Sequence, residues 1–285
     1  MIDLYKKALT KADEIRAELG LNIFEPVNIF DACKHFEVSI RFVNINMEGM
    51  YVKQESGNHP TILLSNQRPF PRRYFTCAHE LGHHIFKHGF KIDALSENEA
   101  KSSNDADEFL VDCFAGSLLM PIAGIQAEFA KRNWIMVKSS PVEFFTVCSV
   151  FGTGYQTMIT HCKTNRLISQ DKAFTLSKTK PATILRSIFS TDLSNSYFKI
   201  IDTQPKSALI DLEVSNYIIL PCDILVEGDH LKKIKETDLG TAYQTVKPGI
   251  VRVYSIDGKF NSLVRIQNSL YTGLAEYRHL ENLKD

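Results

Sequence analysis

A short run of histidine and glutamate residues is the feature of this 285-residue chain best suited to chemistry. Residues 77–84 contain the pattern H-E-x-x-H, in which His79 and His83 are four positions apart. On a helix, this spacing puts both imidazoles on one face, where they can bind one metal ion together. Such a pair favours Zn²⁺, with another divalent ion such as Mn²⁺ as the alternative. Glu80 follows the first histidine and can take a proton from water, which predicts metal-assisted hydrolysis.

The H-E-x-x-H pattern is a weak signal alone, because chance produces it in about two of every hundred chains of this composition. The competing explanation is a surface helix with an accidental histidine pair. The surrounding sequence favours the functional interpretation, since residues 72–88 contain no helix breaker apart from Gly82 and predict a helix. Strand-like segments precede this helix, and a polar surface loop at residues 91–104 and a second helix are expected after it.

A catalytic zinc site needs a third protein ligand and one open position. The elongated zinc-peptidase pattern would put a third histidine at position 89, which is glycine, and has a glycine where this chain has Phe86. His88 is one residue short of that position, so a carboxylate from the later helix is the alternative. That helix offers four carboxylates: Asp105, Asp107, Glu108 and Asp112. Spacing favours Glu108 only slightly, and Asp105 with Glu108 also matches a capping box, which is a purely structural explanation.

Two segments of the chain are specific when they occur together. Residues 74–83 have the sequence YFTCAHELGH. Residues 108–121, EFLVDCFAGSLLMP, fit the pattern E-x-x-A-[ND]-x-F-A followed by L-L-M-P, with Val111 in place of the usual alanine. Together, these segments resemble the active-site helix and the second sequence block of the ImmA/IrrE family of metallopeptidases. The change at Val111 replaces one apolar residue with another and leaves the candidate ligands intact.

The resemblance covers about residues 1–165 and implies a zinc peptidase of the gluzincin type. It implies that His79, His83 and Glu108 bind one Zn²⁺ per chain and that Glu80 is the general base. It also implies a protein substrate, a helix-turn-helix transcriptional repressor. Cleavage of such a repressor would switch on stress-response or mobile-element genes.

Several residues near the motif have two interpretations each. Asp112 could orient a ligating histidine through a hydrogen bond, or it could be a solvated carboxylate. For His84 and His88 we expect packing or surface positions rather than metal ligation. Cys77 and Cys113 flank the site, and we expect buried free thiols rather than redox centres or additional ligands.

Composition and charge exclude several classes of protein. Lys and Arg total 33, as do Asp and Glu, so bulk charge would not hold the chain on nucleic acid or on a membrane. Six cysteines without a C-x-x-C pair are too sparse for a disulfide scaffold and favour a reducing compartment. Residues 1–20 do not resemble a signal peptide. Asp112 and Pro121 interrupt the most apolar stretch, residues 109–125, so we expect a cytoplasmic protein that does not enter a membrane.

The elements that must position the motif can be predicted from local patterns. Apolar residues at helical spacing predict a helix at residues 2–19, and Pro26 can open another. Three strand-like segments follow, at residues 38–43, 49–53 and 61–64. The expected fold class is α+β: a mainly helical, zincin-like peptidase domain with a small three-stranded sheet, followed by a mixed α/β C-terminal domain.

We place the peptidase domain at residues 1–168 and an α+β domain at residues 171–285, with the boundary near 165–175. Residues 141–168 predict a helix-turn-helix shape. Its second helix carries Lys163 as its only Lys or Arg, so we favour a structural role and expect no direct binding to nucleic acid. The C-terminal region has about the size of the GAF-type sensor domain of radiation-response family members. We expect a regulatory or substrate-docking role for it, with a scaffold that only completes the fold as the alternative.

Two functional hypotheses follow from these observations. The leading one is a zinc-dependent endopeptidase that cuts a protein partner, expected to be a DNA-binding repressor. The alternative is a non-catalytic, metal-stabilised regulatory module that binds a protein partner or DNA through residues 141–168. Glu80 separates the two, because a structural zinc site needs no base and fills its fourth position with protein. The presence of Glu80 favours the enzyme.

Overall fold

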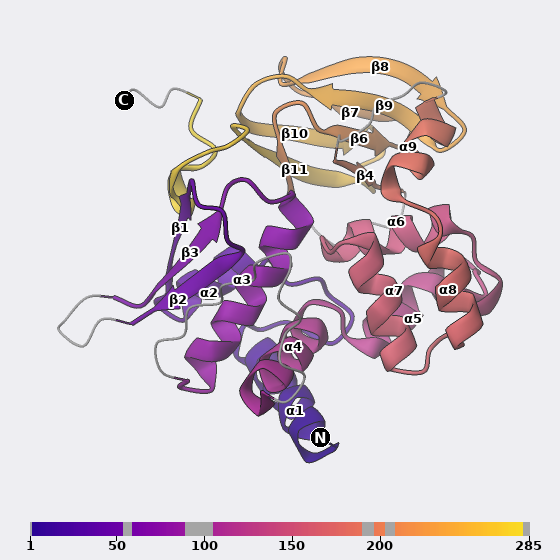
Figure 1. The fold of residues 1–285 in the computed structure, drawn as a ribbon. Helices are drawn as coiled ribbons and strands as arrows, with labels where there is room; N and C mark the ends of the chain where they lie inside the picture. The colour runs from indigo at the N-terminus through magenta and orange to yellow at the C-terminus, as the bar shows by residue number, and fades with distance from the viewer. Residues whose placement is uncertain (1, 54–58, 89–104, 190–196, 203–208, 282–285) are drawn as a thin grey trace. The chain divides into compact units, whose positions relative to one another are not determined.

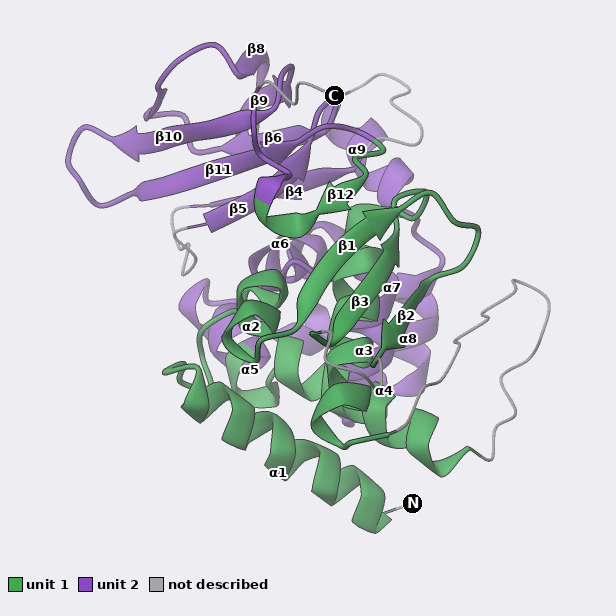
Figure 2. Cartoon of the chain, turned by 90° about the vertical axis from the view of Figure 1, so that its left-hand side faces the viewer, with its two compact units in different colours: residues 1–124, 270–276 green, residues 125–269, 277–285 purple. Residues whose placement is uncertain are grey.

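The structure is a computed structural model that describes residues 2–53, 59–88, 105–189, 197–202 and 209–281 (Figure 1). The predicted loop at residues 91–104 lies outside these described residues. The chain divides into two compact units, shown in separate colours in Figure 2. Unit 1 contains residues 1–124 and 270–276, and unit 2 contains residues 125–269 and 277–285.

Among the described residues of unit 1, four helices carry or flank the predicted motif. They are α1 (Ile2–Glu18), α2 (Ile29–His35), α3 (Phe70–Ile85) and α4 (Ala106–Leu119). The first helix buries Ala8, Ala12 and Ile15 along one side, as its apolar spacing predicts. The buried Arg16 guanidinium donates hydrogen bonds to the carbonyl oxygens of Leu118 (2.7 Å) and Asn22 (2.6 Å). The bond to Leu118 joins α1 to the end of α4.

The sheet of unit 1 contains the three predicted strands and one more. Its strands are β1 (Ser39–Val43), β2 (Gly49–Val52), β3 (Thr61–Ser65) and β12 (Gly273–Leu274), in the order β12-β1-β3-β2. Strands β1 and β3 are parallel, with Ile40 opposite Ile62, whereas β2 is antiparallel to β3. Strand β12 pairs antiparallel with β1, Arg41 lying opposite Leu274. The expected small sheet is therefore completed from the distant end of the chain.

Unit 2 begins with helical structure on both sides of the domain boundary expected from the sequence. Its helices include α5 (Ile122–Lys131), α6 (Pro141–Phe151), α7 (Tyr155–Thr164), α8 (Gln170–Ser177) and α9 (Pro181–Phe189). A capping box of Ser140 and Glu143 opens α6, and Gly152, at φ 68°, ends it. The Tyr155 hydroxyl donates to the Leu176 carbonyl, at 3.1 Å. Helices α7 and α8 thus pack together, and residues 165–175 lie inside unit 2 rather than at its border.

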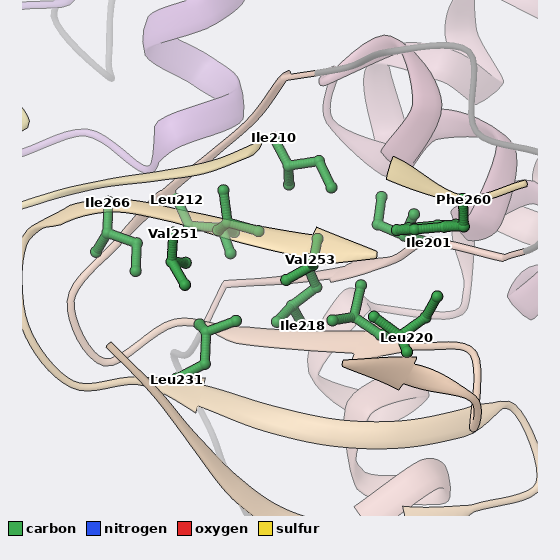
Figure 3. Close-up of a cluster of buried hydrophobic side chains, with 12 residues drawn as sticks. Ile201, Ile210, Leu212, Ile218, Leu220, Leu231, Val251, Val253, Phe260 and Ile266 are labelled. Carbon is green, nitrogen blue, oxygen red and sulfur yellow. The ribbon is translucent and has the colours of Figure 1, made fainter. Parts of the chain in front are cut away.

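Two four-stranded sheets follow these helices among the described residues of unit 2. One has the order β5-β11-β10-β7 and the other β4-β6-β9-β8. The strands are β4 (Phe198–Ile200), β5 (Leu209–Glu213), β6 (Tyr217–Leu220), β7 (Ile224–Val226), β8 (Leu231–Thr237), β9 (Gly240–Thr245), β10 (Gly249–Ser255) and β11 (Asn261–Gln267). Side chains of both sheets, among them Leu212, Ile218, Leu220, Val253 and Ile266, form one buried apolar cluster (Figure 3). This second hydrophobic core, with the helical and strand content of unit 1, confirms the α+β fold class.

One helical segment has the length and composition of a membrane span. It runs from Ala106 to Lys131, and 61% of its most apolar window is buried inside the protein. Its residues Leu110, Val111 and Phe114 are at most 2% exposed. The core helix of a soluble protein can have the same length and apolar composition as a membrane span. These features are therefore weak evidence for membrane insertion.

Candidate metal centre

Helix α3 presents the two histidines of the H-E-x-x-H motif on one buried face. The side chains of His79 and His83 lie one above the other, with their ring centroids 5.0 Å apart. Their Nε2 atoms are separated by 3.2 Å, so both rings direct the same nitrogen toward the same point. Both residues are at most 5% exposed. The helical spacing predicted from the sequence therefore produces the expected pair.

Glu108 on α4 brings its carboxylate to this pair. Its Oε2 atom lies 3.2 Å from Nε2 of His79, and its Oε1 atom lies 3.4 Å from Nε2 of His83. One ligand atom from each of the three residues can be chosen so that all lie within 4.8 Å of one another. Two imidazole nitrogens and one carboxylate form a donor set that suits zinc and leaves a fourth position open. The residues present therefore fit a metal ion.

Close packing of α3 against α4 brings the Glu108 carboxylate within reach of His79 and His83. Gly82 lies between the two histidines in the sequence, and a Cβ atom at this position would be 3.1 Å from side-chain atoms of Val111 and Phe114. That distance is shorter than ordinary van der Waals contact, so only glycine lets the helices approach this closely without displacing a neighbour.

The structure distinguishes Glu108 from the other acidic residues of α4. Asp105 is the N-cap, and its Oδ1 atom accepts hydrogen bonds from the backbone N–H groups of Asp107 (2.9 Å) and Glu108 (3.4 Å). Asp105 thus caps the helix, as its place in the sequence suggests. The Glu108 side chain meanwhile reaches the histidines, so helix capping and metal ligation are not exclusive.

The structure supports the first of the two interpretations of Asp112, in which its carboxylate orients a ligating histidine. Its Oδ1 atom lies 2.8 Å from Nδ1 of His79. A proton on Nδ1 donated to this carboxylate leaves the lone pair of the ring on Nε2, the nitrogen that faces Glu108. Asp112 remains 40% exposed, so its second oxygen can stay hydrated.

The next two histidines lie on different sides of α3. His84 Nδ1 is hydrogen-bonded to the Tyr51 hydroxyl at 2.8 Å, and burial followed by the Lys53 charge lowers the pKa of its ring. The side chain of His84 therefore packs near strand β2, as expected. His88 instead turns back to the metal-site pair, with its Nδ1 atom 3.1 Å from Nδ1 of His83. This contact with His83 was not predicted from the sequence, which favoured a packed or surface position for His88.

The cysteines near the site, Cys77 and Cys113, form no disulfide bond. Cys77 is buried, with its Sγ atom 3.6 Å from that of the buried Cys33. Burial, followed by the charge of Asp112, raises the pKa of Cys113 to about 11. The convergent ligand atoms come from His79, His83 and Glu108, and Cys113 is only partly buried, unlike the buried thiol that we expected.

Glu80 lies on α3 directly after His79 and is 1% exposed. Its side chain is therefore removed from bulk solvent in the same buried stretch of helix as the two histidines. All four candidate residues predicted from the sequence belong to unit 1, namely His79, Glu80, His83 and Glu108.

Comparisons with known proteins give a family match for one part of the chain. No curated protein matches the sequence. Residues 33–160 match the family model Peptidase_M78, described as the IrrE N-terminal-like domain. The matched range contains both helices that bear the candidate ligands. Residues 33–160 are therefore similar to the IrrE N-terminal-like domain of a metallopeptidase-type family, as the two sequence blocks predict.

Proposed function

We propose that the protein is a zinc-dependent endopeptidase that hydrolyses a peptide bond in a protein partner. The observation that carries this proposal is the convergence of three side chains from α3 and α4. The Nε2 atoms of His79 and His83 lie within 3.4 Å of the Glu108 carboxylate oxygens. The match of residues 33–160 to a peptidase family supports the same conclusion.

His79, His83 and Glu108 would hold the zinc ion through two imidazole nitrogens and a carboxylate. When bound, zinc supplies Lewis acidity, which polarises the scissile carbonyl and makes a water molecule more acidic. The charge of Glu108 partly offsets that of the dication in a site where both histidines are buried. Asp112 keeps His79 in the tautomer that directs Nε2 at the metal site.

Glu80 is the proposed general base. Its carboxylate would accept a proton from the attacking water and later deliver it to the leaving amine nitrogen. The backbone of α3 carries both Glu80 and the two histidines, so their spacing is set by one rigid element. A base positioned by the metal-binding helix requires no additional loop to bring it to the site.

The proposed substrate is a helix-turn-helix transcriptional repressor, and the proposed location is the cytoplasm. The substrate rests on the family resemblance of the two sequence blocks. A repressor would deliver a protein segment to the site, so the peptidase itself needs no affinity for DNA. The balanced charge of the chain, 33 basic and 33 acidic residues, is compatible with that division of roles.

The proposal is tested by comparing wild type with Glu80→Gln and Glu108→Ala. Metal content is measured by elemental analysis after exhaustive dialysis, and helix-turn-helix repressors encoded beside the protein are screened by mass spectrometry for new termini. We expect about one zinc per wild-type chain and cleavage of a repressor. Glu80→Gln should keep the metal and lose cleavage, whereas Glu108→Ala should lose both.

A matched control is Glu14→Gln, which alters an exposed carboxylate on α1 and should retain both properties. Cleavage at the wild-type rate by Glu80→Gln would eliminate Glu80 as the base. Full zinc binding in wild type and Glu80→Gln, with cleavage by neither, would favour the non-catalytic regulatory module.

A further inference from the structure

The chain reverses direction directly after α3 and brings His88 back onto the metal-site pair. The helix ends at Ile85, and Lys87 adopts a left-handed conformation with φ 58°. The backbone N–H of His88 then donates to the His83 carbonyl at 3.0 Å. This turn places the His88 ring 5.2 Å from the His83 ring, centroid to centroid.

The contact between the two rings joins specific nitrogen atoms. His83 directs Nε2 toward Glu108 and Nδ1 toward His88, whose Nδ1 lies 3.1 Å away. A metal ligand at Nε2 requires the ring proton on Nδ1, where it can be donated to His88. His88 then carries its own proton on Nε2, which faces Oδ1 of Asp107 at 3.5 Å.

We propose that His88 is a positioning residue for the metal centre, the middle member of a His83–His88–Asp107 relay. The relay would fix the tautomer and the ring angle of His83, so that Nε2 stays directed at the metal. This inference rests on the proposed metal site and names a residue outside its ligand set. Buried ligands of this kind usually donate their second ring N–H to a fixed acceptor, and His88 is that acceptor for His83.

The second imidazole of the pair, His79, also has a hydrogen-bond acceptor at its Nδ1 atom. His79 donates to Asp112, which lies on α4, and the His83 relay ends at Asp107 on the same helix. Helix α4 thus supplies the ligand Glu108 and an orienting carboxylate for each imidazole. Glu108, Asp112 and Asp107 thus connect α4 to the histidines at three points. The geometry of the His79–His83 pair therefore depends on α4.

His88 does not serve as a fourth ligand in this arrangement. It meets His83 at Nδ1, whereas the ligand atoms converge on Nε2. Its ring also stacks on Phe86, with centroids 5.8 Å apart and an interplanar angle of 23°, and its side chain is 11% exposed. The ring is thus held in place on the far side of His83 from the metal site.

The test compares His88→Phe with His88→Gln in the full-length chain. Phenylalanine keeps an aromatic ring beside Phe86 and removes the acceptor, whereas the glutamine amide can accept from His83 and donate to Asp107. Zinc affinity is measured by competition with a chromophoric chelator. We expect a loss of about tenfold or more in His88→Phe, most of which is recovered in His88→Gln.

His84→Phe is the matched control, because it removes a neighbouring histidine whose hydrogen bond goes to Tyr51. Its zinc affinity should equal that of wild type. A second measurement reports on the hydrogen bond itself, using proton NMR of the cobalt-loaded protein. Wild type should show two paramagnetically shifted, exchangeable ring N–H signals, from His79 and His83. His88→Phe should lose one of them to fast exchange with water, and His88→Gln should keep both.

Equal zinc affinity and both N–H signals in His88→Phe would overturn the relay while leaving the proposed peptidase intact. A wild-type chain that binds no zinc would overturn the metal centre, and the relay with it. Thermal unfolding checks that each variant folds. If neither His88 variant folds, Asp107→Asn replaces them, and unchanged affinity together with an unchanged His83 N–H exchange rate would overturn the relay.

Discussion

The Asp112 carboxylate lies 2.8 Å from Nδ1 of His79, on the side of the ring opposite the candidate ligand atom. We expect Asp112→Ala to lower zinc affinity by about 10- to 100-fold, because His79 loses the acceptor that orients it. Asp112→Asn should lose less, since an amide oxygen still accepts from Nδ1–H. Chelator competition measures both variants. Asp223→Ala, on an exposed carboxylate of unit 2, is the control, and equal affinity in Asp112→Ala and this control would contradict the assignment.

Gly82 sets how closely α3 approaches α4. Alanine there improves helix propensity by up to about 1 kcal/mol, but its Cβ would meet Val111 and Phe114 at 3.1 Å. Overpacking in a filled core costs about 1–3 kcal/mol, so we expect Gly82→Ala to lower the free energy of unfolding. Zinc affinity should fall as well, because the helices must separate. Urea unfolding and chelator competition check the two effects, and a stabilised variant with unchanged affinity would show that the contact relaxes freely.

The six cysteines should differ in their reactivity. Cys222 is exposed, whereas Cys113 is half-buried and burial raises the pKa of its thiol to about 11. The thiolate is the reactive form, so iodoacetamide at pH 8 should modify Cys222 first and Cys113 far more slowly. Peptide mapping by mass spectrometry over time measures the order. Modification of Cys113 at the rate of Cys222 would mean that its thiol is activated, which would revive a redox or ligand role.

Lys199 should make the stability of unit 2 depend on alkaline pH. Burial lowers its pKa to about 8, from 10.5 in an unfolded chain, against the attraction of Asp211. Below pH 8 both states hold the proton, and the cost of burying the charge is fully present. Between pH 8 and 10.5 the folded state has released it while the unfolded state has not, so stability rises with pH across this window.

We therefore expect Lys199→Met to raise the free energy of unfolding at pH 7 by up to about 3 kcal/mol. The gain should shrink as pH approaches 10.5, because the wild-type lysine becomes neutral in both states. Urea unfolding of both proteins at pH 7 and pH 10 gives the difference. A gain that does not change with pH would place its origin in packing rather than in charge.

Much of unit 1 could be predicted from local patterns. Strand-like segments at residues 38–43 and 61–64 predicted β1 and β3, and four-residue spacing predicted the face that His79 and His83 share, because each signal lies within one element. Spacing alone could not select Glu108 among the acidic residues of α4. That choice depends on the separation of two helices, which the packing at Gly82 sets.

Two features had no readable signal in the sequence. Strand β12 contains two residues, too few to show an alternating pattern, and its partner β1 is more than two hundred positions away. The contact of His88 with His83 depends on the left-handed backbone of Lys87, a conformation that lysine adopts rarely. A continuous helix would have carried position 88 away from the ligand face.

The pairing of β12 with β1 also bears on how the chain is made. Residues 270–276 belong to unit 1, yet they are translated after nearly all of unit 2. The sheet beside the helix that carries the two histidines is therefore completed only after residues 125–269 have been made, and a chain that stops before β12 would expose the edge of β1 to other strands. Synthesis of most of unit 2 is thus a condition for a complete sheet in unit 1.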